Sequence, residues 1–185
     1  TDNGRDWLGD SRPADEINER GKNGGNFGWP LCYANQVLDV TQAKPGDSRC
    51  KNTIAPKVQI AAHSAPLGLA FYTGTLFPSD YHNDLLVALH GSWNRSTLSG
   101  YKVVFVPFEN GRPAGPPRDI LSGFLAPDEQ ESYGRPVGVT LAADCARLVA
   151  ADVGNVIWRG TGKETQCGVF SILSLTRGFR VWGGD

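Results

Sequence analysis

The feature that most constrains the fold is a succession of short apolar segments separated by turn-forming residues, with almost no helical periodicity. Gly, Pro, Asn and Asp fill the stretches between them, such as "ENGRPAGPP" and "LAPDEQESYGRP", and tight turns require these residue types. Only "PADEINER" is expected to form a helical turn. The pattern predicts an all-β chain. The expected strands are residues 67–72, 84–89, 101–107, 119–121, 138–142, 147–151, 155–159 and 169–175.

Two stretches repeat one plan and favour a β-propeller among all-β folds. "APLGLAFYTGTLFPSDYHNDLLVALHG" and "RPVGVTLAADCARLVAADVGN" both contain Pro, an apolar residue and Gly, then a strand, a turn and a second strand that ends at polar groups. Successive propeller blades repeat in this way. A Greek-key sandwich also repeats hairpins, so the pattern alone leaves both folds open.

Composition excludes two classes of partner. The 185 residues are 40% hydrophobic with a net charge of -1, as in one ordinary soluble domain. Acidic and basic residues are interspersed, so no basic face for nucleic acid is expected. The longest apolar runs fall far short of the roughly 20 residues that a membrane-spanning helix needs. A polar small molecule is the expected partner.

The chain begins at Thr1 and contains no methionine, and we expect it to be a piece of a longer or processed protein. Its four cysteines fall into two local pairs, Cys32 with Cys50 and Cys145 with Cys167, for which we predict two disulfides. The alternative is four buried thiols, and four cysteines permit three connectivities. No CxxC spacing supports a zinc site. Disulfides imply the periplasm or the cell exterior.

Several long motifs carry a resemblance to a known family. "NGRDWLGDSRPADEIN", "GGNFGWPLCY", "AHSAPLGLAFYTG", "ALHGSWNRS", "GYKVVFVPF" and "GRPVGVTLAAD" resemble the C-terminal half of the sorbosone or pyranose dehydrogenases, relatives of the soluble quinoprotein glucose dehydrogenases. The resemblance implies a six-bladed β-propeller of four-stranded blades, of which only the C-terminal part is present. Residues 1–60 would then be a loop-rich segment with the cofactor loop, 61–130 one blade, and 131–185 the last blade and tail.

The same resemblance implies a cofactor and a reaction. The family binds pyrroloquinoline quinone (PQQ) and calcium at the mouth of the propeller channel and oxidises sugars or sugar-derived aldehydes. Its histidine general base lies in an earlier blade, so no catalytic residue is expected in this chain. The missing N-terminal propeller half or a second chain is an expected partner, because half a ring exposes strand edges. An external electron acceptor is expected too, since no CxxCH haem motif occurs.

Candidate cofactor residues follow from the chemistry of PQQ, which carries three carboxylates and a flat ortho-quinone. Arginine matches carboxylate with a planar, permanently charged fork. The resemblance puts Arg135 of "GRP" against a carboxylate, and Arg95 of "WNR" is a second candidate, with a solvated turn as the alternative. His63 and His90 are expected at the channel mouth, although a lone histidine is more often structural. Trp93 is expected either to stack on the cofactor or to fill the core.

The expected metal ligands are main-chain oxygens. In the family, calcium is held partly by carbonyls of a loop in the position of "NGRD", which here are those of Gly4 and Arg5. The glucose dehydrogenases have Gly-Pro there, so Arg5 is a departure. Asp15 and Glu16 form a second oxygen-rich pair that relatives use for structural calcium. The alternative for this pair is a solvated acidic turn.

A second class of function stays open beside the dehydrogenase. A non-catalytic propeller of the same ancestry would bind carbohydrate or a protein partner, and the polar groups of "HGSWNR" would merely survive in it. The presence of both arginines and both channel histidines favours the dehydrogenase. The identity of the sugar and of the electron acceptor is not specified by any motif in the chain.

Overall fold

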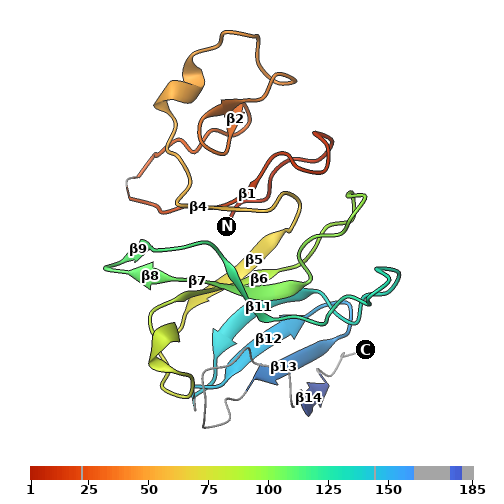
Figure 1. Cartoon of the computed structure of the whole chain (residues 1–185). Coiled ribbons are helices and arrows are strands. Elements are labelled where there is room, and N and C mark those ends of the chain that lie inside the picture. Colours follow the sequence, from red (N-terminus) through yellow and green to blue (C-terminus); the bar gives the residue numbers. More distant parts are fainter. Residues whose placement is uncertain (22, 144, 161–175, 181–185) are drawn as a thin grey trace, which may run out of the picture.

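The computed structural model describes residues 1–21, 23–143, 145–160 and 176–180 (Figure 1). Its described elements are β-strands apart from two short 3-10 turns, η1 (Arg49–Asn52) and η2 (Ser79–Tyr81), which confirms the all-β prediction. No helix in these ranges is long and apolar enough to cross a membrane.

The first sheet is an antiparallel meander whose strands lie in the order β10-β7-β6-β5. Strand β6 is buried along its whole length because both faces of the sheet are covered, and it pairs with β7 from Leu85 opposite Val106 to Leu89 opposite Lys102. A continuous apolar run is the sequence pattern of such a doubly covered strand. The strands are β5 (Pro66–Phe71), β6 (Leu85–Leu89), β7 (Lys102–Val106) and β10 (Arg118–Leu121).

The second sheet has the same plan, in the order β11-β12-β13-β14. It lies beside the first sheet, with β11 against β5 (Figure 1). A Cβ atom on Gly68 of β5 would lie 2.7 Å from the Val137 carbonyl oxygen and 2.9 Å from the Gly138 Cα, so only glycine allows this approach. The repeated Pro-apolar-Gly motif therefore marks the closest contact of the two sheets. The strands are β11 (Pro136–Leu141), β12 (Arg147–Ala151), β13 (Val156–Gly160) and β14 (Thr176–Arg180).

The hydrophobic core lies on both faces of the first sheet. On one face, Val87 and Val104 pack against Ile17, Val58 and Ile60 of a two-stranded ladder formed by β1 (Asp15–Ile17) and β4 (Val58–Ile60). On the other face the first sheet packs against the second. The residues of that second cluster are Tyr72, Phe77, Leu86, Val103, Phe105, Val139 and Val149. Two stacked meanders with neighbouring first strands are the arrangement of adjacent propeller blades.

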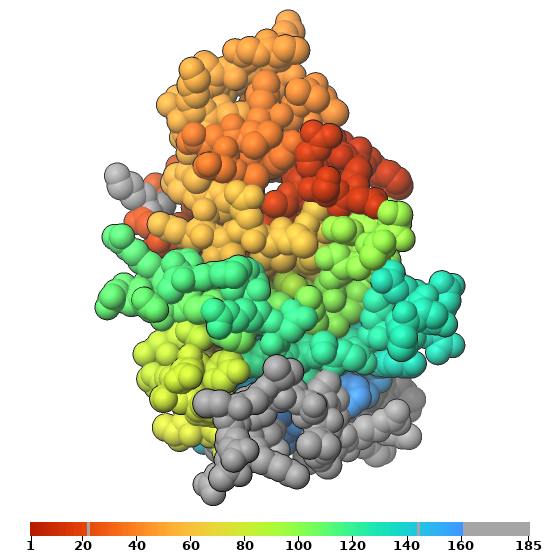
Figure 2. Space-filling model, in the orientation of Figure 1, coloured from red at the N-terminus to blue at the C-terminus, as the bar shows by residue number. Residues whose placement is uncertain are grey.

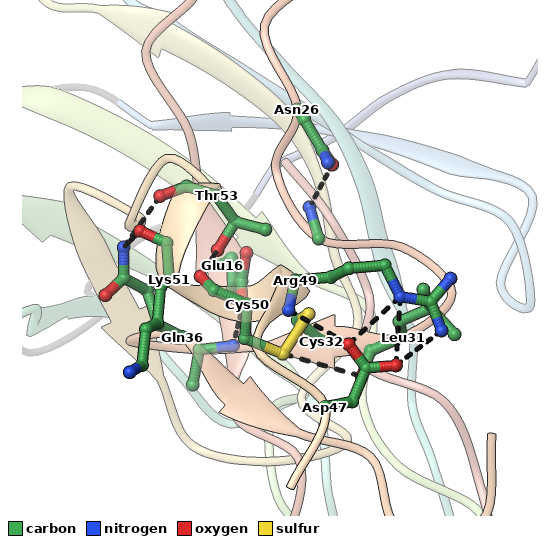
Figure 3. The surroundings of a disulfide bond; sticks show 12 residues. Glu16, Asn26, Leu31, Cys32, Gln36, Asp47, Arg49, Cys50, Lys51 and Thr53 are labelled. Carbon is green, nitrogen blue, oxygen red and sulfur yellow. Dashed lines mark hydrogen bonds and ion pairs between the residues drawn. A yellow bond between two sulfur atoms is a disulfide. The ribbon is translucent and has the colours of Figure 1, made fainter. Parts of the chain in front are cut away.

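A disulfide closes a loop-rich lobe, built around residues 32–50, at one end of the molecule. Cys32 and Cys50 are bonded, as predicted, with Cα atoms 5.6 Å apart (Figure 3). We call residues 32–50 the disulfide loop, which contains the hairpin of β2 (Cys32–Tyr33) and β3 (Val37–Leu38). A further small hairpin joins β8 (Phe108–Glu109) and β9 (Arg112–Pro113). Figure 2 shows the lobe in orange beside the N-terminal segment in red.

The expected helical turn at "PADEINER" is wrong. Asp15–Ile17 is strand β1, and it pairs antiparallel with β4 from Asp15 opposite Ile60 to Ile17 opposite Val58. The reason is tertiary: all three residues of β1 are buried against neighbours distant in the chain, which outweighs a weak local helix preference.

Two other expectations fall partly or wholly outside the described residues. Cys145 has no disulfide partner within the described ranges, and Cys167, to which the sequence assigns it, lies beyond them. The expected strand over 169–175 also lies outside the described ranges, and β14 begins at Thr176. The other seven expected strands are confirmed as β5, β6, β7, β10, β11, β12 and β13.

Candidate functional site

The candidate site lies where the N-terminal loop meets the loop that follows β6. The Asn94 side-chain amide donates a 2.7 Å hydrogen bond to the Asp6 carboxylate, and the Ser96 backbone N–H donates one of 3.1 Å to Asp10. The Ser96 hydroxyl also bonds to Asp10. These bonds join residues almost ninety positions apart in the chain, so they fix the N-terminal loop over the end of the first sheet.

A pocket of about 150 Å³ opens at this junction. Four of the residues singled out from the sequence meet there, namely Gly4, Asp15, His63 and Trp93. The remaining lining residues were not predicted, although Asp6 and Asn94 directly adjoin predicted residues and that adjacency was the available signal. These are Asn3, Asp6, Ala65, Gly91 and Asn94.

His63 lines the pocket, and its ring is hydrogen-bonded to the N-terminal loop. It is buried and adopts a left-handed backbone conformation, with φ at 62°. Its Nε2 atom lies 2.9 Å from the Gly9 carbonyl oxygen, so this nitrogen carries the proton and donates. Its Nδ1 atom lies 3.8 Å from the Asp6 carboxylate. The ring holds the N-terminal loop, which supports the structural role weighed above for this histidine.

Trp93 does not fill the core, so that alternative is wrong. Its side chain is 62% exposed, and it makes an edge-to-face contact with Trp7, which is 76% exposed, at a centroid distance of 5.5 Å. The edge of one indole thus packs on the other, and Trp93 presents an exposed apolar ring in the pocket lining. Trp7 was not among the predicted residues.

Arg135 lies outside the pocket lining and binds the backbone at the start of the loop after β6. Its Nε donates a 3.1 Å hydrogen bond to the His90 carbonyl oxygen, and its Nη2 donates to the Gly91 carbonyl oxygen. The guanidinium also lies over the Tyr101 ring, 5.2 Å from the centroid. The Tyr101 hydroxyl in turn donates a 2.6 Å bond to the Ser92 carbonyl oxygen, so Arg135 and Tyr101 shape this loop together.

Arg95 is also bound to main-chain carbonyls. Its Nη1 and Nε atoms donate 2.9 Å hydrogen bonds to the carbonyl oxygens of Ala62 and Thr97. The side chain is half-buried, so the fully solvated turn considered from the sequence is wrong. Arg95 does not line the pocket, but it connects the segment before β5 to the loop after β6.

His90 connects the two sheets and likewise lies outside the pocket lining. Its Nε2 atom lies 3.0 Å and 3.1 Å from the two carboxylate oxygens of Asp152, the residue after β12. Partial burial opposes ionisation of Asp152, but the hydrogen bond and charge of His90 outweigh it and hold the pKa of that carboxyl below its ordinary value.

The loop of Gly4 and Arg5 is fixed through the buried carboxylate of Asp15. Asp15 accepts 2.8 Å hydrogen bonds from the backbone N–H groups of Gly4 and Ala65, one on each oxygen. A Cβ atom on Gly4 would lie 2.4 Å from Pro13 Cγ, so the tight packing admits only glycine. Among the described residues, none donates a hydrogen bond to the carbonyl oxygen of Gly4 or Arg5. Both carbonyls are therefore available to a ligand.

Asp15 and Glu16 do not form a solvated acidic turn, because both side chains are buried in β1. Successive strand residues point to opposite faces. Glu16, which lies beside the disulfide (Figure 3), accepts a hydrogen bond from the Ala34 backbone N–H of the disulfide loop and another from the Asn18 amide. Burial raises the pKa of both carboxyls. No cluster of three His, Cys, Asp or Glu side chains suited to a metal occurs in the described ranges.

The chain is similar to known proteins both in sequence and in structure. A family model described as TrAA12-like matches residues 6–159. The pyrroloquinoline quinone-dependent pyranose dehydrogenase of Coprinopsis cinerea is 32% identical over 164 residues, covering 71% of this chain and 22% of that protein. The holo structure of its PQQ domain matches with a TM-score of 0.61 at 25% identity, covering 84% of this chain and 47% of that one.

Two further proteins are similar over most of the chain. A calcium structure of the Trichoderma reesei family AA12 protein matches with a TM-score of 0.65 at 26% identity, covering 81% of this chain and 43% of that one. A Borreliella burgdorferi protein described as uncharacterized is 39% identical over 161 residues, covering 86% of this chain and 42% of that protein. The chain thus spans less than half the length of the relatives that it matches.

Proposed function

This chain belongs to the TrAA12-like family, which confirms the expected kinship with PQQ-dependent sugar dehydrogenases, and we propose that it contributes part of the cofactor site of such an enzyme. The proposed reaction is the PQQ- and calcium-dependent oxidation of a sugar or sugar-derived aldehyde, with electrons passing to an external acceptor. The observation that carries the proposal is the pocket in which Gly4, His63 and Trp93 meet.

The residues in the pocket and on the loops beside it fit PQQ in three respects. The Asn94 side-chain oxygen is buried and has no hydrogen-bond partner, so it offers an acceptor to a ligand. The exposed indole of Trp93, held by its edge-to-face contact with Trp7, offers a ring face on which a flat cofactor can stack. Arg95 and Arg135 each have five N–H donors and direct two nitrogens at carbonyls, which leaves donors for carboxylates.

The Gly4–Arg5 segment fits calcium. Calcium prefers several hard oxygen ligands, and main-chain carbonyls are among them. The carbonyl oxygens of Gly4 and Arg5 have no donor among the described residues, while Asp15 fixes the Gly4 amide at 2.8 Å. We propose that these two carbonyls supply part of the calcium coordination, with the other ligands coming from elsewhere in the protein.

In the proposed mechanism, this chain positions groups and carries no general base. When bound, PQQ supplies the two-electron acceptor and calcium polarises it. His63 fixes the N-terminal loop through Gly9, and Asn94 fixes the same loop through Asp6. Arg135 holds the backbone of residues 90 and 91, so the loop that carries Trp93 starts from a fixed point. The fixed loops exclude water from one wall of the pocket.

Further blades are proposed as the partner of this chain, within a six-bladed ring. Leu67, Leu69 and Phe71 on alternate positions of β5 are 36–47% exposed, and they lie on the face that the β1–β4 ladder covers only in part. The Thr1 hydroxyl donates a 2.9 Å hydrogen bond to the Leu67 carbonyl oxygen at that face. A preceding blade would bury this row. The blade could come from an N-terminal extension or from a second chain.

One observation favours the alternative, a non-catalytic propeller that binds carbohydrate or a protein. Arg95, Arg135 and His90 are all engaged with protein groups and none of them lines the pocket. A scaffold that keeps its loops but has lost its cofactor would look the same. In either case the disulfide supports the proposal of a periplasmic or extracellular location.

Calorimetric titration of PQQ with calcium into the full-length native protein separates the two functions. The dehydrogenase predicts calcium-dependent binding that weakens about tenfold or more in Arg135→Ala, because a hydrogen bond to a charged group contributes about 1.5–3 kcal/mol. Arg112→Ala, an exposed arginine of the β9 hairpin, is the matched control and should bind like the wild type. Absence of binding by the wild-type protein would leave the non-catalytic propeller.

A further inference from the structure

The side chain of Arg5 points away from the Gly4–Arg5 segment, whose carbonyl oxygens are proposed to bind calcium, and it contacts the disulfide loop. Its Nη1 atom lies 3.1 Å from the Asp39 Oδ2 atom and also donates to the Thr41 hydroxyl. Asp39 is only 2% exposed and directly follows β3, while the Arg5 side chain is 25% exposed. A partly buried ion pair with a second hydrogen bond restrains both partners far more than an exposed pair does.

Asp39 divides its two carboxylate oxygens between two tasks. Oδ1 accepts hydrogen bonds from the backbone N–H and the hydroxyl of Thr41, at 2.8 Å and 2.6 Å, and so stabilises the turn after β3. Oδ2 faces Arg5. Both oxygens of the buried carboxylate are therefore engaged, one by the turn and one by Arg5.

We propose that Asp39 is a positioning residue, which fixes the carbonyl oxygens of Gly4 and Arg5 for calcium by holding the Arg5 side chain. The inference rests on the proposed function, because it takes those carbonyls as metal ligands. A proline at position 5 would restrain this backbone through its ring. In this chain an ion pair to the disulfide loop replaces that restraint.

The disulfide is the other end of this connection. Cys32 and Cys50 close the loop that carries Asp39, and the Glu16 carboxylate accepts a bond from the Ala34 backbone within the same loop. The loop is thus fixed to β1 and to Arg5 at separate points. Asp39 is connected to the disulfide through its backbone N–H, which donates a 2.8 Å hydrogen bond to the carbonyl oxygen of Leu31, the neighbour of Cys32.

Asp39→Asn is the variant that breaks the ion pair and spares the turn. The amide oxygen can still accept from Thr41, while the amide nitrogen then opposes Arg5 Nη1, donor against donor. Asp47→Asn is the matched control, since Asp47 pairs with Arg49 on the surface of the same loop and does not contact the N-terminal segment.

The measurement is the affinity of the calcium-free, full-length native protein for Ca²⁺ alone, by calorimetry and by terbium luminescence. We expect Asp39→Asn to weaken binding about 10–100-fold, the usual effect of removing a group that orients a metal ligand. Asp47→Asn should leave the affinity unchanged. Arg5→Pro supplies the restraint through the backbone, so Asp39→Asn should have no effect when it is combined with Arg5→Pro.

The outcomes separate the two proposals. If the wild-type protein binds no Ca²⁺, the proposed function and this inference both fail. If the wild type binds Ca²⁺ and Asp39→Asn binds equally well, the proposal that the Gly4 and Arg5 carbonyls bind calcium survives, and the proposed role of Asp39 is overturned. A third outcome is that Asp39→Asn lowers the Ca²⁺ affinity equally in the wild-type and Arg5→Pro backgrounds. That result would show that Asp39 acts on the fold of its own loop and not through Arg5, and it would also overturn the proposed positioning role.

Discussion

The two stacked sheets and the segment before them are stabilised by different physics. The sheets, from Pro66 onward, bury aliphatic side chains such as Leu86 and Val87 between paired strands. Residues 1–65 have little apolar core, and three buried carboxylates there hold backbone N–H groups and side chains of distant loops. The sheets therefore depend on packing, and the N-terminal segment depends on polar contacts and one disulfide. The candidate site lies where the two meet.

The largest expected effect is on the sheet core. Leu86→Ala removes a side chain that is 1% exposed in the contact between the two sheets, and we expect a loss of about 2–5 kcal/mol in the free energy of unfolding. Chemical denaturation measures it. Val40→Ala, at a position 71% exposed in the disulfide loop, should change stability little. Equal losses of unfolding free energy in Leu86→Ala and Val40→Ala would contradict the claim that the sheets depend on apolar packing more than the disulfide loop does.

Removal of the disulfide should come next. Cys32→Ser with Cys50→Ser opens a bridge between residues 18 positions apart, for which loop-closure entropy gives roughly 3 kcal/mol. We expect the loss of amide hydrogen-exchange protection to be confined to residues 32–50. Lys51→Ala, an exposed neighbour of Cys50, is the control. If protection were lost in β6 and β7 as well, the two regions would be one cooperative unit.

The contact between the sheets can be tested at Gly68. Gly68→Ala forces a Cβ atom to within 3 Å of the β11 backbone, and overpacking of this kind costs about 1–3 kcal/mol. Gly21→Ala is the matched control, because a Cβ atom there meets nothing within 4 Å. Thermal unfolding of both variants gives the comparison, and a stable Gly68→Ala protein would mean that the two sheets move apart easily.

The smallest effect concerns Glu16, whose pKa is raised by burial. An acid with a raised folded-state pKa stabilises the fold fully below its unfolded-state pKa, and this contribution is lost as pH rises through the folded value. Glu16→Gln should thus be within about 1 kcal/mol of the wild type at pH 7. Its amide can also satisfy the buried, unpaired oxygen of Asn18 if that side chain rotates.

The direction in which stability changes with pH tests whether the pKa of Glu16 is raised in the folded protein. Relative to Glu16→Gln, the wild-type protein should gain stability as the pH falls from 7 toward the ordinary glutamate pKa of 4.5. Denaturation of calcium-free samples across this range measures the difference between the two proteins. A wild type that loses stability relative to the variant on acidification would mean that Glu16 is stabilised as the anion.

The same contrast explains how much the sequence could predict. Strands such as β6 and β12 were predictable because their apolar runs need no partner to be recognised. The β1–β4 ladder was missed because its strands have three residues each, and buried acids at Asp15 and Glu16 look like a solvated turn until their distant partners are known. Short elements held by long-range polar contacts leave no local pattern.

The candidate site was predictable in the same uneven way. Gly4, Asp15, His63 and Trp93, which were named from motifs far apart in the chain, line one pocket, but their role toward a cofactor stays a prediction. Arg95 and Arg135 were expected to face the ligand, but a sequence does not tell which carbonyls a guanidinium will bind in the folded chain. Asp39 had no signal, because its role depends on a loop that folds back onto Arg5.

The position of Asn94 has a consequence for how the protein is produced. Asn94, Arg95 and Ser96 form the triplet that accepts N-linked glycans, and in the fold the Asn94 amide is bonded to Asp6 with its oxygen buried. A glycan added during synthesis in a eukaryotic secretory host would occupy the place of the N-terminal loop. A bacterial host avoids that modification and leaves the Asn94 side chain unchanged, so a difference in calcium or PQQ binding between hosts would report on whether a glycan displaces this loop.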